Sequence, residues 1–209
     1  MRNLRYLVHL VGLTAVIAAA TSCGSIARQG RSPVYLVVDK LEGRRGGIAS
    51  ATFGNPVVSD VVTNVTSPAP CTNVSPCPTV FADNGQVTLR AQLKDPTTLV
   101  DPTPTNDVTI NRYHVAYRRS DGRNTQGIDV PFAFDGATTG TVRIGSTATL
   151  PFELVRIVAK EETPLVNLTQ SLTVVTTIAE VTFYGFDQAG NAITVAGLIQ
   201  VDFGNFGDF

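Results

Sequence analysis

The chain has 209 residues with 16 basic and 17 acidic side chains, which gives a formal net charge of −1 at neutral pH. This near-balance gives no sign of the strong basic character that favours binding to the nucleic-acid backbone, so we expect no nucleic-acid partner. Residues 34–209 are long enough to bury a substantial core as one domain.

Residues 1–22 have the organisation of a secretory signal peptide. Arg2 and Arg5 give a positively charged start, and an apolar run follows from Leu7 to Ala20. A membrane-spanning helix needs about 20 apolar residues, and the polar residues of this segment leave too few. We therefore expect cleavage; a single-pass anchor is the less favoured alternative.

The residues at the end of this segment, Ala20-Thr21-Ser22-Cys23, resemble the lipobox of bacterial lipoproteins. That resemblance implies that Cys23 carries fatty acyl chains and becomes the mature N-terminus, with residues 23–33 as a flexible tether. Gly24 follows, where aspartate would signal inner-membrane retention, so the resemblance also implies an outer-membrane or surface destination. The membrane is then the expected partner, through the lipid. The alternative is a plain signal peptide followed by an ordinary cysteine.

From Val34 onward the pattern of apolar residues predicts β-strands. Alternation with period two is clearest in 86–94, where Val87, Leu89 and Ala91 fall on one side, and in 108–119, where Tyr113, Val115 and Tyr117 do so. No segment has a helical stripe. The predicted strands cover residues 34–41, 60–65, 86–94, 108–119, 147–159, 172–187 and 191–203.

Two turns are predicted between these strands. Asp83-Asn84-Gly85 separates residues 78–82 from residues 86–89, and Asn-Gly is typical of a tight hairpin. Asp187 to Asn191 predicts a second hairpin, in which Asp187 caps the turn by bonding backbone amides. Residues 179–203 resemble the last strand pair of bacterial immunoglobulin-like and fibronectin-like modules, and this resemblance implies an all-β, antiparallel immunoglobulin-like β-sandwich.

The segment from Asp95 to Asp107 contains three prolines and is a candidate domain boundary. A split there would leave residues 34–94 with a core of marginal size, and long loops are common between sandwich strands. We therefore predict one sandwich domain over residues 34–209.

The cysteines are consistent with export. Once Cys23 is assigned to lipid, Cys71 and Cys77 form a pair that an oxidising compartment would join as a disulfide. The alternative is a metal site, but two thiols without a nearby histidine or third cysteine do not complete a tetrahedral zinc shell. We expect no bound metal and no cofactor.

Catalytic chemistry has little support in the sequence. His114 is the only histidine of the mature chain, and Arg112 and Arg118 flank it on the same strand face, which favours a solvated side chain over an oriented base. We find no nucleophile elbow, phosphate loop or zinc-protease motif. Glu153 is one of several carboxylates, and Glu161-Glu162 beside Lys160 is interpreted as a polar turn. We predict that the protein is not an enzyme.

One segment, Arg118 to Gly136, supports a binding hypothesis. Arg118, Arg119 and Arg123 can clamp carboxylates or sulfates, and Phe132 and Phe134 can contact a partner. The alternative is that the arginines form a solvated strand end and the phenylalanines cover the core.

The resulting functional expectation is a non-catalytic adhesion, scaffold or accessory protein of the cell envelope with an envelope protein as partner. The competing hypothesis is an envelope hydrolase or ligand-binding accessory protein that works through the Arg118–Asp135 loop. A deep cleft that gathers His114 with Glu153 or Asp129 would favour the enzyme, and a flat, exposed sheet edge would favour assembly.

Overall fold

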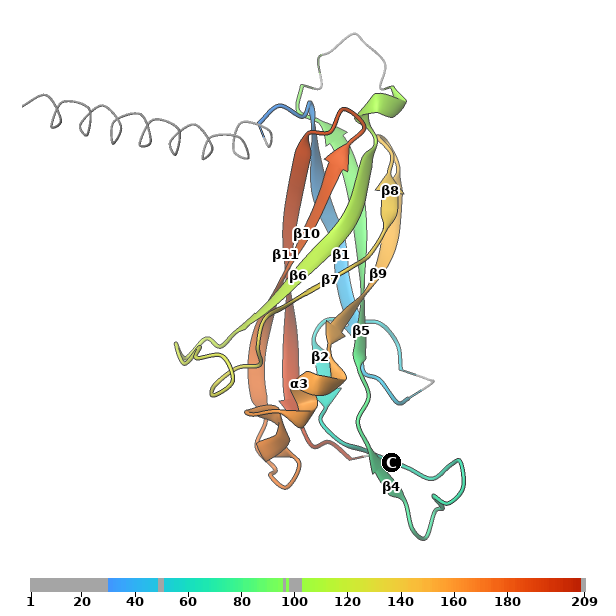
Figure 1. Cartoon of the computed structure of the whole chain (residues 1–209), viewed down its shortest axis with the longest axis vertical. Helices are drawn as coiled ribbons and strands as arrows, with labels where there is room; N and C mark the ends of the chain where they lie inside the picture. Colours follow the sequence, from blue (N-terminus) through green and yellow to red (C-terminus); the bar gives the residue numbers. More distant parts are fainter. Residues whose placement is uncertain (1–29, 49–50, 96, 98–102, 208–209) are drawn as a thin grey trace, which may run out of the picture.

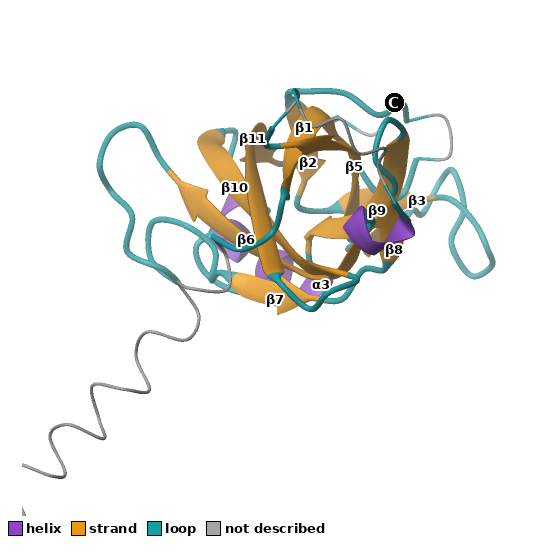
Figure 2. Ribbon diagram, turned by 90° about the horizontal axis from the view of Figure 1, so that it is seen from above, coloured by secondary structure: helices purple, strands orange, loops and turns teal. Residues whose placement is uncertain are grey.

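Two β-sheets packed face to face form the body of the protein (Figure 1). The computed structural model describes residues 30–48, 51–95, 97 and 103–207. Figure 2, viewed along the long axis, shows the sheets curved around a common interior, with β5 and β9 on one side and β6 and β10 on the other. The all-β prediction is confirmed.

The smaller sheet has three antiparallel strands in the order β1-β5-β9. They are β1 (Val34–Arg44), β5 (Asp83–Leu93) and β9 (Thr147–Val155). The alternation predicted for β5 is present, because Val87, Leu89 and Ala91 are buried and the residues between them are partly exposed. A register shift between Val38 and Lys40 allows β1 to bury Leu36 and Leu41, which are an odd number of residues apart.

The larger sheet has six strands. Its main path is β2 (Val57–Asp60), β11 (Ala192–Gly204), β10 (Val175–Asp187), β6 (Val108–Arg118) and β7 (Phe134–Gly136), and β8 (Gly140–Val142) also pairs with β6. The pair β2–β11 is parallel, so the larger sheet is mixed, whereas its other strand pairs are antiparallel as expected. Only strands joined by a tight hairpin must run antiparallel, and β2 and β11 lie far apart in the chain.

The core lies between the two sheets. Four of its rings, Tyr113, Phe134, Phe152 and Phe183, pack in a group with centroids 5.4–6.4 Å apart. Residues that precede and residues that follow the 95–107 segment in the sequence contribute buried side chains to the same hydrophobic cluster. In addition, β5, which precedes this segment, pairs with β9, which follows it.

Short elements close the end of the sandwich where β2 ends and β5 begins. The strand expected over 147–159 ends at Val155, and the helix α3 (Ile157–Glu161) and the 3-10 turn η2 (Leu165–Leu168) follow it. A second 3-10 turn, η1 (Pro104–Asn106), precedes β6. Within the described ranges, no helix has the length and hydrophobicity that crossing a membrane requires.

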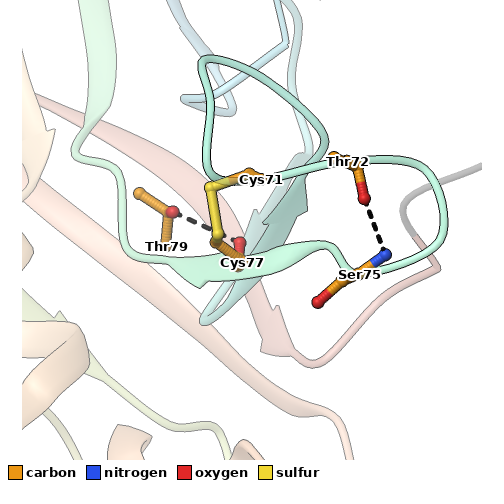
Figure 3. Close-up of a disulfide and its surroundings, with 5 residues drawn as sticks. All are labelled: Cys71, Thr72, Ser75, Cys77 and Thr79. Atoms are coloured by element: carbon orange, nitrogen blue, oxygen red, sulfur yellow. Dashed lines mark hydrogen bonds between the residues drawn. A yellow bond between two sulfur atoms is a disulfide. The ribbon is translucent and has the colours of Figure 1, made fainter.

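The predicted disulfide joins Cys71 to Cys77 and is confirmed. It spans the excursion between β3 (Thr63–Val65) and β4 (Cys77–Thr79), which pair with each other as a small separate sheet. Inside the excursion, the amide of Ser75 donates to Thr72 Oγ1 at 3.0 Å (Figure 3). The disulfide therefore holds together a segment with few buried residues.

The hairpin predicted at Asp83-Asn84-Gly85 is wrong. These residues begin β5, and their pairing partners lie in β1 and β9. Gly85 has no positive φ; a Cβ at this position would lie 2.3 Å from the ring of Phe152. The glycine is explained by the close approach of an aromatic ring to a strand, and this feature cannot be distinguished from a turn signal in the sequence.

The second hairpin, between β10 and β11, is confirmed. Asp187 accepts hydrogen bonds from the amides of Ala189 and Asn191 at 3.0 and 2.8 Å, and Gly190 supplies the positive φ that the turn requires.

Candidate functional site

The connection between β6 and β7 is an exposed segment that the sequence singled out for binding. We call residues 118–133 the arginine loop. Its two ends are fixed because β6 and β7 pair with each other within the larger sheet. Figure 1 shows the loop, in yellow-green and yellow, projecting sideways from the sandwich. It is therefore an accessible segment carried by a rigid support.

The arginines of the loop are arranged around one carboxylate. Asp121 accepts hydrogen bonds from Arg119 at 3.1 and 2.6 Å and from Arg123 at 3.0 and 2.9 Å. The hydrogen bonds from Arg119, and then those from Arg123, hold the pKa of Asp121 well below its usual range. Arg118 forms a separate pair with Glu180 at 3.1 Å. The structure thus brings Arg119 and Arg123 together, and it places Arg118 beside a different acid.

These pairs leave the three arginines unequally available. The side chains of Arg118 and Arg123 are largely exposed, whereas that of Arg119 is mostly covered. Exposed ion pairs contribute little to stability and exchange readily with other partners. Arg118 and Arg123 can therefore reach an incoming anion, and Arg119 mainly positions Asp121.

The second half of the loop is a tight, internally bonded turn. The amide of Thr125 donates to the Asp129 carboxylate at 3.1 Å, and the amide of Gly127 donates to the carbonyl of Val130 at 2.8 Å. Gly127 has a φ of 76°, and its carbonyl accepts a hydrogen bond from Thr163 at 2.7 Å. The turn is thus fixed both internally and to the segment that follows α3.

Two large apolar side chains project from this turn into solvent. Ile128 is 70% exposed and Phe132 is 48% exposed. The ring of Phe132 lies against Gly127, where a Cβ would approach it to 2.5 Å. Phe132 was predicted from the sequence as a contact residue and Ile128 was not, although an isoleucine between Gly127 and Asp129 has no strand in which to be buried.

The expectation that Phe134 contacts a partner is wrong. Phe134 is 6% exposed, packs edge-on against Tyr113, and lies under the Arg156 guanidinium at 4.4 Å. It occupies a core-facing position of β7, and Asp135, the next residue, faces outward. The alternative that this phenylalanine covers the core is therefore the right one.

His114 is not brought together with the other candidate catalytic residues. It pairs with Asp135 through Nδ1 at 3.3 Å and belongs to the larger sheet. Glu153 belongs to the smaller sheet, opposite the exposed residue Asn84. An open groove of about 660 Å³ near β6 and β10 includes Asp135 but neither Glu153 nor Asp129.

A second cluster, which was not predicted from the sequence, lies inside the protein. Lys160 and Asp83 are 2% and 0% exposed, and the Lys160 ammonium donates to Asp83 Oδ1 at 2.9 Å. It also donates to the carbonyl of Asp60 at 2.8 Å. Asp60 is paired with Arg45 at 3.0 Å. We call these four residues the buried charge cluster.

Burial of the cluster is explained by the elements that meet there. Asp83 occupies a core-facing position of β5, in phase with Gly85 and Val87, and Asp60 ends β2. Lys160 enters from α3, so the interpretation of Lys160-Glu161-Glu162 as a polar turn is wrong for Lys160. Burial lowers the pKa of Lys160, and the neighbouring Asp83 opposes this shift.

The two clusters differ in what they can do chemically. The arginine loop presents apolar and cationic groups to solvent and can bind another molecule, whereas the buried charge cluster is sealed and can react only within the chain. Among the residues that the structure describes, no group of three histidine, cysteine or acidic side chains is arranged to hold a metal ion.

Comparisons of the chain with protein-family models, curated proteins and solved structures found no match.

Proposed function

We propose that the protein is a lipid-anchored, non-catalytic binding module of the bacterial cell envelope that recognises an envelope protein through the arginine loop. The observation that carries this proposal is the exposure of Ile128 and Phe132 on a turn fixed by its own hydrogen bonds. Large apolar side chains on a pre-organised loop are typical of binding hot spots, because little conformational entropy is lost on association.

The charges of the loop indicate the chemistry of the partner. Arg118 and Arg123 add exposed cations to the apolar pair, and both are already bonded to carboxylates of this chain. A partner that supplies its own carboxylates can replace these exposed bonds with similar ones. We therefore propose a protein surface with an apolar pocket and acidic residues around it.

The position of the described N-terminus supports a membrane tether. In Figure 1, the described chain begins at the upper end of the long axis, and α3 and the β3–β4 excursion lie at the lower end. Acyl chains on Cys23 would hold the upper end near the bilayer through residues 23–33, which precede the first strand. The excursion, with its disulfide, would then point away from the membrane.

The immunoglobulin-like assignment is part of the same proposal. Two face-to-face sheets and the final β10–β11 hairpin with its Asp187 turn support it. The hydrolase alternative has less support, because His114 and Glu153 belong to different sheets.

Crosslinking and affinity capture from intact envelopes test this function. The full chain is compared with the variant Ile128→Ser/Arg123→Ala, and Leu198→Ser, an exposed apolar position on β11, is the matched control. Loss of a hot spot should lower recovery of a discrete partner by about 10-fold or more, and the control should retain it. Equal recovery by the loop variant and the control, or no discrete partner with the wild type, would overturn the proposal.

A further inference from the structure

The contact between Lys160 and Asp83 joins a primary amine to a carboxyl group in a site without solvent. Lys160 Nζ lies 2.9 Å from Asp83 Oδ1, and both side chains are almost fully buried. A buried ion pair has a large desolvation cost that its Coulombic attraction does not always repay. Conversion of the pair into an uncharged product removes that cost.

We propose that Lys160 and Asp83 form an intramolecular isopeptide bond. The bond would join α3 to the first residue of β5, across 77 positions of the chain. The two groups are held in place by the fold, so the reaction needs no diffusional encounter, and such positioning greatly lowers the barrier of an amide-forming step.

The surroundings favour the nucleophile. Burial lowers the pKa of Lys160, so a neutral amine forms more readily there than in water. The carbonyl of Asp60 accepts a second hydrogen bond from Nζ at 2.8 Å and orients the nitrogen. Lys160 therefore has the two properties that an attacking amine needs, which are desolvation and a fixed direction.

The surroundings also activate the carboxyl group. The amide of Gly46 donates to Asp83 Oδ1 at 2.9 Å, and the hydroxyl of Ser59 donates to Oδ2. The donor on Oδ2 stabilises the negative charge that develops on this oxygen when the carbonyl carbon becomes tetrahedral, and the Gly46 amide holds Oδ1, the oxygen that leaves. Exclusion of water then protects the product from hydrolysis.

The step balances without any further reagent. Lys160 Nζ passes one proton to Oδ1, and its lone pair then forms the Nζ–Cγ bond. The Cγ–Oδ1 bond breaks as the nitrogen gives up a second proton, and one water molecule leaves. Oδ2 becomes the oxygen of a neutral amide and keeps the hydrogen bond from Ser59.

Trypsin digestion of the full chain, after denaturation, reduction and alkylation, tests the bond directly. Arginines at positions 45, 90 and 156 and the lysine at 160 delimit the relevant peptides, and no other arginine or lysine lies within residues 46–89 or after 160. An unlinked chain releases the tetrapeptide 157–160. A linked chain resists cleavage at Lys160 and yields a branched peptide that joins 46–90 to 157–209, lighter by one water than the two peptides together.

Amine acylation of the denatured chain gives an independent readout. Lys40 and Lys94 should react, and Lys160 should not, because its nitrogen is already an amide. The matched variant Lys160→Arg keeps the charge but cannot form the bond, so it should release residues 46–90 as a free peptide. The wild-type digest decides the matter even if that variant does not fold. Stoichiometric release of the tetrapeptide from the untreated chain, or acylation of Lys160 as complete as that of Lys40 in a separate sample, would overturn the proposal.

Discussion

Replacement of Gly85 by alanine tests whether the Phe152 ring is the reason for a glycine inside strand β5. The added Cβ would lie 2.3–2.7 Å from three atoms of that ring. The ring cannot move freely, because it packs against Tyr113 and Phe183 with centroids 5.4 Å away in each case. Overpacking of this kind costs about 1–3 kcal/mol, and for a domain of this size about 2 kcal/mol lowers the Tm by about 4–8 °C.

Urea unfolding followed by circular dichroism measures the effect. The matched control is Gly54→Ala, since a Cβ at Gly54 has no atom within 4 Å and its φ is not positive. The double variant Gly85→Ala/Phe152→Leu creates room for the methyl group and should lose less stability than the sum of the two single changes. If Gly85→Ala unfolds at the same urea concentration as Gly54→Ala, or if the double variant is additive, the close-packing explanation is refuted.

Three further predictions concern the core, the last hairpin and the disulfide. Phe134→Ala should cost about 3–5 kcal/mol of unfolding free energy because it empties a core site, whereas Phe132→Ala should cost less than about 1 kcal/mol. Equilibrium unfolding measures both losses. Similar losses for the two variants would contradict the placement of Phe134 in the core and Phe132 in solvent. Asp187→Ala should cost about 1–2 kcal/mol at neutral pH through loss of the turn hydrogen bonds. Burial raises the pKa of Asp187, but the hydrogen bonds from Asn191 and Ala189 outweigh this effect, so the folded-state pKa is lowered. The stabilisation is therefore complete above the unfolded pKa of about 3.9 and disappears as the pH falls through the folded-state pKa. A difference in stability between wild type and Asp187→Ala that is independent of pH would argue against this explanation. Joint replacement of Cys71 and Cys77 by serine should cost about 2 kcal/mol and speed proteolysis within the β3–β4 excursion, which limited digestion would show, and unchanged digestion would mean that the bond does not stiffen this segment.

The features that the sequence predicts well depend on local patterns. Alternation in β5 and β6 identifies both the strands and their buried faces, because the side-chain period of a strand is two. The Asp187 turn is predictable for a similar reason, since its capping bonds lie within five consecutive residues. The disulfide follows from the number of cysteines and the inferred compartment.

The features that the sequence misses depend on contacts between distant residues. Gly85 is explained only by Phe152 and Lys160 only by Asp83, and neither contact is visible in a local pattern. The parallel edge strand β2 likewise pairs with a strand at the far end of the chain. One signal for the buried charge cluster was present, because Asp83 continues the core-facing phase of Val87 and Leu89.

The candidate binding site was predictable as a segment but not residue by residue. An arginine cluster followed by a proline-containing apolar stretch indicates an exposed loop. Which side chains remain in solvent depends on where β7 begins, and this places Phe134 in the core and leaves Phe132 outside. Ile128 is exposed because the turn that carries it is held by Asp129 and Thr163.

Attachment to the membrane through acyl chains on Cys23 is the claim on which the proposed function depends most directly. Mass spectrometry of the N-terminal tryptic peptide from the protein purified out of its native envelope tests it. We predict a peptide covering residues 23–28 that begins at Cys23 and carries fatty acyl chains, attached through a diacylglyceryl group on its sulfur and directly on its α-amino group. A mature chain that begins at another residue, or a Cys23 thiol without lipid, would contradict the proposal.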